Sequence, residues 1–199
     1  GRPLRVTKFL AYRWSADADA ALLDEATGTS LDVARATGFD GLVAAQRALL
    51  DDFWCDADVE LEGDAEVQQA LRFGLFHLFQ AAVHAGGRPI PAKGLTGAGY
   101  GGHAFWDTET FVLPVLTYTA PRLARDALRW RSATLGHARA RARELGLRGA
   151  AFAWRTITGP ECSGYLPAGT AAFHVNADIA GAIVRYVAAS GDEAFDRDH

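Results

Sequence analysis

The chain has 199 residues, of which 49% are hydrophobic and 22% are charged, and its formal net charge at pH 7 is −4. This composition is typical of a folded globular protein with one sizeable core, and it excludes an intrinsically disordered chain. The acidic balance, with arginines scattered through the sequence, argues against a nucleic-acid partner.

Cysteine usage and hydropathy favour a cytoplasmic protein. Cys55 and Cys162 lie far apart, so we expect a reducing compartment and no disulfide framework. The scattered histidines indicate no metal site, and neither an apolar run of membrane-spanning length nor a leader sequence is visible. The chain begins at Gly1, lacks methionine and stops just after a helix-start signal at Asp192, so we expect it to be a piece of a longer protein.

The first 55 residues predict one strand followed by helices. Apolar residues alternate over Leu4–Tyr12, which predicts a single strand without a partner in this chain. Residues 15–28 are small, acidic and alanine-rich, as in a linker or a marginal helix. Thr29 or Ser30 is expected to cap a short helix, and the apolar positions of residues 39–54 predict a second helix without chemistry of its own.

Two further helices follow in the next part of the chain. Asp64 is a suitable N-cap for an amphipathic helix that ends at Gly86–Gly87. An apolar helix is predicted from Thr108 to Thr119, and Pro114 inside it is expected to produce a kink because proline has no backbone N–H.

A long arginine-rich helix and a last apolar helix complete the pattern. Pro121 is favourable in a first turn, and the long helix is predicted to reach Glu144, before Gly146. We interpret its arginines as a solvated face, with anion binding as the alternative. These residues are Arg122, Arg125, Arg129, Arg131, Arg139, Arg141 and Arg143. His174 to Ser190 predicts the last helix, which stops at Gly191.

The glycine-rich stretch from Ile90 to Thr110 is the first candidate functional segment. Its glycines permit a tight path close to a ligand, and it ends in His103, Trp106, Asp107 and Glu109. An indole face and a neighbouring carboxylate suit a sugar, whose C–H surface packs on the ring while its hydroxyls donate to the carboxylate. The alternative is that Asp107 caps the following helix and Trp106 packs beneath it.

A second irregular stretch spans residues 149–172. A segment of this length without periodicity inside a compact domain is usually functional. It again combines an aromatic ring with polar groups, namely Trp154, Arg155, Thr156, Glu161 and Tyr165. Because consecutive helices pack antiparallel, alternate loops should meet at one end of a helical ring, so the pattern predicts a mainly α helical toroid.

Two strings of this sequence resemble glycoside hydrolase family 65. The first is G-L-T-G-x-G-Y-G-G-H-x-F-W-D-T-E, and the second is W-R-T-I-x-G-x-E-C-S-x-Y-x-P-A-G-T-A-x-F-H-x-N-A-D-I-A. The family contains inverting disaccharide phosphorylases and hydrolases that act on α-glucosides such as maltose, trehalose, kojibiose and nigerose. The similarity extends over essentially all 199 residues.

The resemblance implies three parts of a larger architecture. Residues 1–14 would be the last strand of an N-terminal β-sandwich domain, and residues 15–55 would be a linker with helices. Residues 56–199 would form the first part of an (α/α)6 barrel, the catalytic domain of the family. The full-length protein is a possible homodimer.

The resemblance also assigns residues to the substrate. Trp106 and Asp107 match the pair that holds the glucose of the donor site. Trp154 and Arg155 match positions that face the leaving sugar, and because many members have Trp-Glu there, Arg155 leaves the natural disaccharide open. Four more residues in the matching strings either line the pocket or hold the loops in place: Lys93, His103, Glu161 and His174.

The reaction implied by the resemblance is cleavage of an α-glucosidic disaccharide with inversion. A carboxylic acid protonates the glycosidic oxygen while inorganic phosphate attacks the anomeric carbon, without a metal or an organic cofactor. The acid would be a glutamate beyond residue 199 in a G-P-D-E-Y-like motif, so we expect no catalytic acid here. Asp107 and Glu109 are two residues apart and do not face each other in a helix. A hydrolase and a non-catalytic sugar- or protein-binding helical module are the alternatives.

Overall fold

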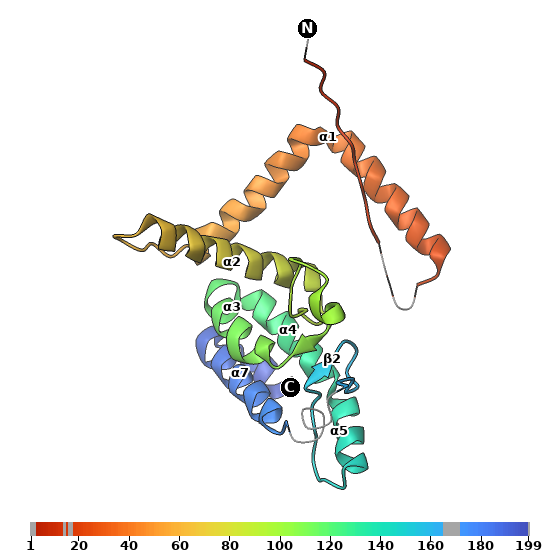
Figure 1. Cartoon of the computed structure of the whole chain (residues 1–199), viewed down its shortest axis with the longest axis vertical. Helices are drawn as coiled ribbons and strands as arrows, with labels where there is room; N and C mark the ends of the chain where they lie inside the picture. The colour runs from red at the N-terminus through yellow and green to blue at the C-terminus, as the bar shows by residue number, and fades with distance from the viewer. Residues whose placement is uncertain (1–2, 14, 16–17, 165–171, 199) are drawn as a thin grey trace. The chain divides into compact units, whose positions relative to one another are not determined.

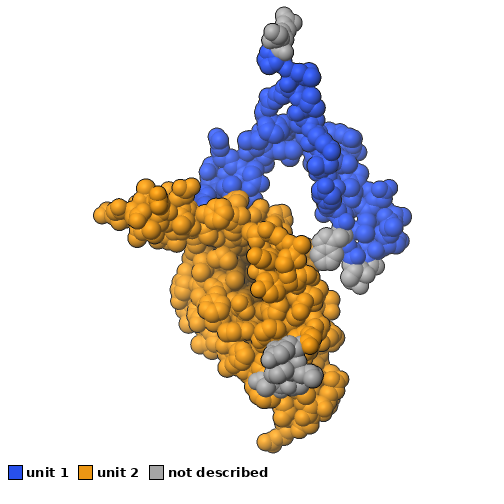
Figure 2. Space-filling model, in the orientation of Figure 1, with its two compact units in different colours: residues 1–55 blue, residues 56–199 orange. Residues whose placement is uncertain are grey.

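The computed structural model describes residues 3–13, 15, 18–164 and 172–198. The described residues are mainly helical, as the sequence predicts, and the chain divides into two compact units (Figures 1 and 2). The first unit is Gly1–Cys55 and the second is Asp56–His199. No helix in the described ranges has the length and hydrophobicity needed to cross a bilayer.

The strand predicted over Leu4–Tyr12 is absent, because residues 3–13 are irregular. Leu4, Val6 and Tyr12 are 89%, 80% and 85% exposed, so the alternating apolar face packs against nothing in this unit. A strand requires the hydrogen bonds of a neighbouring strand, and none of the described residues provides them here. The segment therefore forms no strand with the described residues, and its assignment to a preceding β-sandwich domain stays a prediction.

Helix α1 (Ala20–Ala57) begins earlier than the sequence predicts. Asp19 caps it by accepting a hydrogen bond from the Leu22 amide at 2.9 Å. The predicted caps Thr29 and Ser30 are wrong, since both lie inside the helix and donate their hydroxyls to the carbonyl four residues earlier, at 3.0 and 2.9 Å. Because such a hydrogen bond satisfies the hydroxyl inside a helix, Thr29 and Ser30 are compatible with the helix interior and need not mark a helix start.

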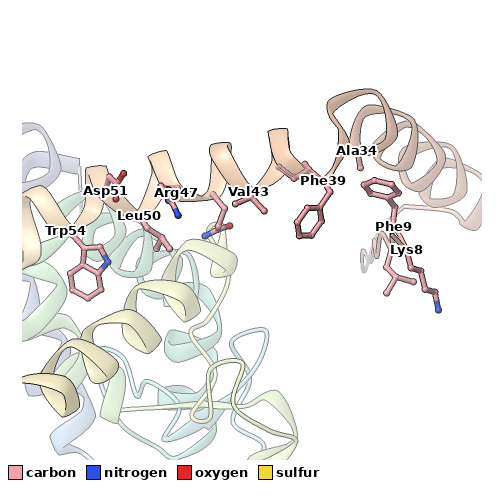
Figure 3. Close-up of a pocket in the computed structure, with 12 residues that line it drawn as sticks. Lys8, Phe9, Ala34, Phe39, Val43, Arg47, Leu50, Asp51 and Trp54 are labelled. Atoms are coloured by element: carbon pink, nitrogen blue, oxygen red, sulfur yellow. The ribbon is translucent and has the colours of Figure 1, made fainter. Parts of the chain in front are cut away.

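The predicted interruption before the second helix is present as a kink at Gly38, with φ 71° and ψ 167°. Beyond the kink, the apolar face of α1 is partly exposed: Phe39 and Val43 are 49% and 44% exposed, whereas Phe53 is buried. This face borders a groove of about 700 Å³ together with Phe9 from the N-terminal segment. Figure 3 shows Phe39, Leu50 and Trp54 along this face. None of the predicted sugar-binding residues lines the groove.

Helix α2 (Ala65–Ala85) lies in the second unit, and both of its predicted ends are confirmed. The Asp64 carboxylate accepts hydrogen bonds from the amides of Glu66 and Val67 at 2.9 and 3.1 Å. Gly86 ends the helix in the left-handed conformation, with φ 54°. Both ends therefore follow the usual physical chemistry of helix termini.

Replacing Asp64 by alanine should lower the free energy of unfolding by about 1 kcal/mol, because two amide donors lose their acceptor. Urea denaturation measures the change. Asp64→Asn is the matched control, since an asparagine side chain also caps helices well. Equal stability of the alanine and asparagine variants would contradict this role.

The core of the second unit lies between α3 (Leu113–Thr119), α4 (Pro121–Ala133) and α7 (His174–Ser190). These helices pack against one another, and α2 contacts α4 (Figure 1). The short α8 (Glu193–Asp198) packs on α7. Buried side chains between the elements include Leu113, Leu116, Leu128, Ala182, Tyr186 and Phe195.

Two predicted helices have different boundaries in the structure. The helix expected from residue 108 begins as the π-helix η2 (Thr108–Val112), and Pro114 lies in the first turn of α3, where η2 ends. The predicted kink is thus a change of helix type. The long arginine-rich helix is divided at Thr134 into α4 and α5 (Leu135–Glu144).

Candidate functional site

The two candidate loops are joined by a short antiparallel ladder. Strand β1 (Ala104–Phe105) pairs with β2 (Arg155–Thr156), so that Phe105 lies opposite Arg155. Continuing this register by one residue matches Trp106 with Trp154. The Phe105 ring contacts Trp154 edge-to-face, with centroids 5.0 Å apart and an interplanar angle of 88°. Segments about 50 residues apart in sequence therefore meet at one place.

Trp106 and Asp107 leave the ladder and lead into η2. The Trp106 ring is half-buried and contacts the exposed His174 ring edge-to-face, with centroids 4.8 Å apart. Asp107 has helical angles, φ −54° and ψ −31°, and its side chain makes no cap hydrogen bond, so the interpretation of Asp107 as an N-cap is wrong. Its carboxylate is exposed and has no hydrogen bond or ion pair within the described part of the chain. It is available to a ligand.

Glu109 is two residues further on and has a different environment. Its carboxylate receives two hydrogen bonds from Arg131, at 2.7 Å from Nε and 3.0 Å from Nη2, and both side chains are 1% exposed. The solvated-face interpretation is therefore wrong for Arg131. Glu109 is engaged in this bidentate pair, which joins η2 to α4. It is therefore not free to act as an acid or base together with Asp107.

Glu161 holds the second loop from within. Its carboxylate accepts hydrogen bonds from the amides of Trp154, Arg155 and Ser163 at 2.7, 3.3 and 2.8 Å. It also forms an ion pair with Arg141 of α5 at 3.1 Å. The solvated-face interpretation is thus wrong for Arg141 as well, because that side chain is 15% exposed.

Asn176 is a loop anchor that the sequence reasoning missed. From α7, its side-chain oxygen accepts a hydrogen bond from the Phe152 amide at 3.1 Å, and its nitrogen donates to the Ala150 carbonyl at 2.7 Å. The residue lies in the second matching string, but an asparagine in a first helical turn also suits capping. Its sequence position alone therefore could not identify this contact.

Arg155 and His103 lie beside each other across the ladder. Arg155 Nη2 is 3.2 Å from His103 Nδ1, which is also 2.7 Å from the Tyr100 carbonyl oxygen. Nδ1 can donate to the carbonyl or accept from the guanidinium, but it cannot do both. The Arg155 Nε atom is buried without a hydrogen-bond partner among the described residues, and the guanidinium carbon is 5.8 Å from the centre of the Phe105 ring.

The glycine-rich loop brings Lys93 close to the backbone of η1 (Gly99–Gly102). A Cβ at Gly99 would lie 3.1 Å from Lys93 Cε, so a larger residue there would displace the lysine side chain. Lys93 is exposed, and its carbonyl accepts hydrogen bonds from the amide and hydroxyl of Thr96. Tyr100 has a left-handed φ of 61°, which is rare for a residue with a side chain and often occurs at functional sites.

Cys162 is the cysteine of the second loop. The pKa of the Cys162 thiol is raised, mainly by desolvation of the sulfur and to a smaller extent by the negative charge of Glu161, although the residue as a whole is exposed. A neutral thiol is a poor nucleophile. No group of three or more metal-binding side chains occurs in the described ranges. Tyr165 lies outside the described residues.

Residues 72–199 match the family model for the glycosyl hydrolase family 65 central catalytic domain. This match covers more than half of the chain, and the chain therefore belongs to glycosyl hydrolase family 65.

Three similar proteins illustrate the relationship. An uncharacterized glycosyl hydrolase of Mycobacterium tuberculosis is 62% identical over 199 residues, which are 100% of this chain and 25% of that protein. An α,α-trehalose phosphorylase of Thermoanaerobacter brockii is 45% identical over 98% of this chain and 25% of its own length. A solved structure described as a "putative kojibiose phosphorylase from human microbiome" has a TM-score of 0.84 and 32% identity, over 92% of this chain and 24% of that one. The chain thus spans about a quarter of the length of these relatives.

Proposed function

We propose that the complete protein cleaves an α-glucosidic disaccharide with inversion, by phosphorolysis to β-glucose 1-phosphate and a free sugar. Family membership and the relatives named as trehalose and kojibiose phosphorylases support a disaccharide phosphorylase or hydrolase. The observation that carries the proposal is the β1–β2 ladder, which brings the loop with Trp106 and Asp107 beside the loop with Trp154 and Arg155.

In the proposed architecture, residues 56–199 form the first part of an (α/α)6 barrel. Residues 1–14 end a β-sandwich domain, and residues 15–55 form a linker. The packing of α3 against α4, and the loops that meet at β1 and β2, support the barrel assignment. We assign the complete protein to the cytoplasm.

The proposed glucose site consists of Trp106 and Asp107. The half-buried indole offers a face to the C–H surface of the ring, and the free carboxylate accepts hydrogen bonds from its hydroxyls. Trp154 and Arg155 contact the leaving sugar across the ladder. We also propose Lys93, His103 and His174 as pocket-lining side chains; in support, His103 lies beside Arg155 and the His174 ring contacts Trp106.

The proposed reaction needs one acid and one anionic nucleophile. A glutamate beyond residue 199 donates its proton to the glycosidic oxygen as the glycosidic bond breaks. Inorganic phosphate forms the new bond on the opposite face of the anomeric carbon, which inverts its configuration. Because phosphate is already anionic, no general base and no cofactor are required.

Phosphate dependence tests this proposal and separates it from its alternatives. The complete protein is incubated with trehalose, kojibiose, maltose and nigerose, with and without phosphate, and glucose 1-phosphate is measured. We expect glucose 1-phosphate from one of these sugars only when phosphate is present. Cleavage at an equal rate without phosphate would identify a hydrolase. Sugar binding without cleavage in either condition would identify a non-catalytic module.

A further inference from the structure

We infer that Glu161 is a positioning residue, which fixes Trp154 and Arg155 for the leaving sugar while Arg141 holds its carboxylate from α5. This inference rests on the proposed function, because Trp154 and Arg155 are placed there beside the leaving sugar. It chooses the second of the two roles that the sequence left open for Glu161, which were lining the pocket and holding the loops in place.

The hydrogen bonds of Glu161 leave little capacity for a sugar hydroxyl. An ionised carboxylate has about four lone-pair sites. Among the described residues, Oε1 accepts hydrogen bonds from the Arg155 and Ser163 amides and Oε2 accepts one from the Trp154 amide, while Oε2 also forms an ion pair with Arg141. The Glu161 side chain is 12% exposed, so it is directed into the loop and not toward solvent. Glu161 is thus occupied by the protein.

These contacts define the shape of the loop between Trp154 and Ser163. The Cys162 amide donates to the Arg155 carbonyl at 3.1 Å, so the two ends of the segment already meet. Glu161 fills the inside of this turn and fixes the amides of both candidate leaving-sugar residues. Backbone groups inside a loop require such a partner, because no helix or extended sheet satisfies them.

The donor site is supported by different contacts. Trp106 and Asp107 precede η2, which the buried Glu109–Arg131 pair joins to α4. A change at Glu161 should therefore disturb the leaving sugar more than the glucose that becomes glucose 1-phosphate.

The experiment measures the reverse reaction of the complete protein, with β-glucose 1-phosphate as donor and glucose as acceptor. The variants are Glu161→Gln and Arg141→Met, and the matched controls are Glu144→Gln and Arg143→Met, since both control residues are exposed on α5. In Glu161→Gln we expect the KM for glucose to rise by roughly tenfold or more, with kcat and the KM for glucose 1-phosphate within about twofold of wild type. Arg141→Met should show a smaller change in the same direction.

Amide hydrogen exchange provides a second readout that does not depend on activity. The amides of Trp154, Arg155 and Ser163 should exchange faster in Glu161→Gln and remain protected in Glu144→Gln. Unchanged exchange would overturn the positioning role, as would a rise in the KM for glucose 1-phosphate in place of the KM for glucose. If Glu161→Gln does not fold, Arg141→Met tests the positioning role through the KM for glucose and the exchange rates of the same amides. A wild-type protein without disaccharide activity would refute the proposed function, and exchange would still report whether Glu161 holds the loop.

Discussion

Replacing Asp107 by alanine should reduce kcat/KM of the complete protein by about a thousandfold, equivalent to about 4 kcal/mol of transition-state stabilisation. The carboxylate is the proposed acceptor for glucose hydroxyls, and such charge-assisted hydrogen bonds are strong in a desolvated site. Its free energy of unfolding should change by less than about 0.5 kcal/mol, because the exposed Asp107 carboxylate makes no cap hydrogen bond. Steady-state kinetics and urea denaturation measure the two quantities.

Asp64→Ala serves as the opposite control. Asp64 caps α2 through two amides, so its loss should lower stability while leaving kcat/KM near the wild-type value. Activity of Asp107→Ala within about threefold of wild type, an effect below 1 kcal/mol, would remove Asp107 from the site.

Breaking the buried ion pair between Glu109 and Arg131 should produce the largest loss of stability. Glu109→Gln or Arg131→Met should each lower the free energy of unfolding by about 3–5 kcal/mol, because either change leaves a buried charge without its partner. The double variant Glu109→Leu/Arg131→Met should recover part of this loss, since apolar side chains bury no charge. Denaturant unfolding of all three variants measures these differences.

Arg122→Met is the matched control for the buried arginine. Arg122 is exposed in the first turn of α4, so its replacement should change stability by less than about 0.5 kcal/mol. Single variants at Glu109 and Arg131 that lose less than 1 kcal/mol, or a double variant no more stable than the singles, would contradict the role of the pair.

Both ends of α2 were predictable from the sequence. Asp64 and Gly86 satisfy amide and carbonyl groups locally, so a few neighbouring residues contain the necessary information. Leu4–Tyr12 shows the opposite case. Its alternating pattern is genuine, but a strand forms only with a neighbour, and this chain supplies none within its described residues.

Long-range pairing limited the prediction of the site. Seven arginines of α4 and α5 look alike in sequence, and what distinguishes Arg131 is a glutamate 22 residues away in another helix. The same holds for Arg141, whose partner Glu161 lies in an irregular loop. Glycine content and aromatic residues were enough to locate both loops. The ladder that joins them has two residues per strand, which is too short for a periodic signal.

The short ladder also limits which changes of length the two loops can accommodate. Successive side chains along a paired strand alternate in direction, so one inserted or deleted residue reverses every side chain beyond it. Such a change between Ala104 and Trp106, or between Trp154 and Thr156, would turn the aromatic rings away from their present partners. Variation in loop length should therefore be confined to positions outside these paired residues, where it leaves the directions of Trp106 and Trp154 unchanged.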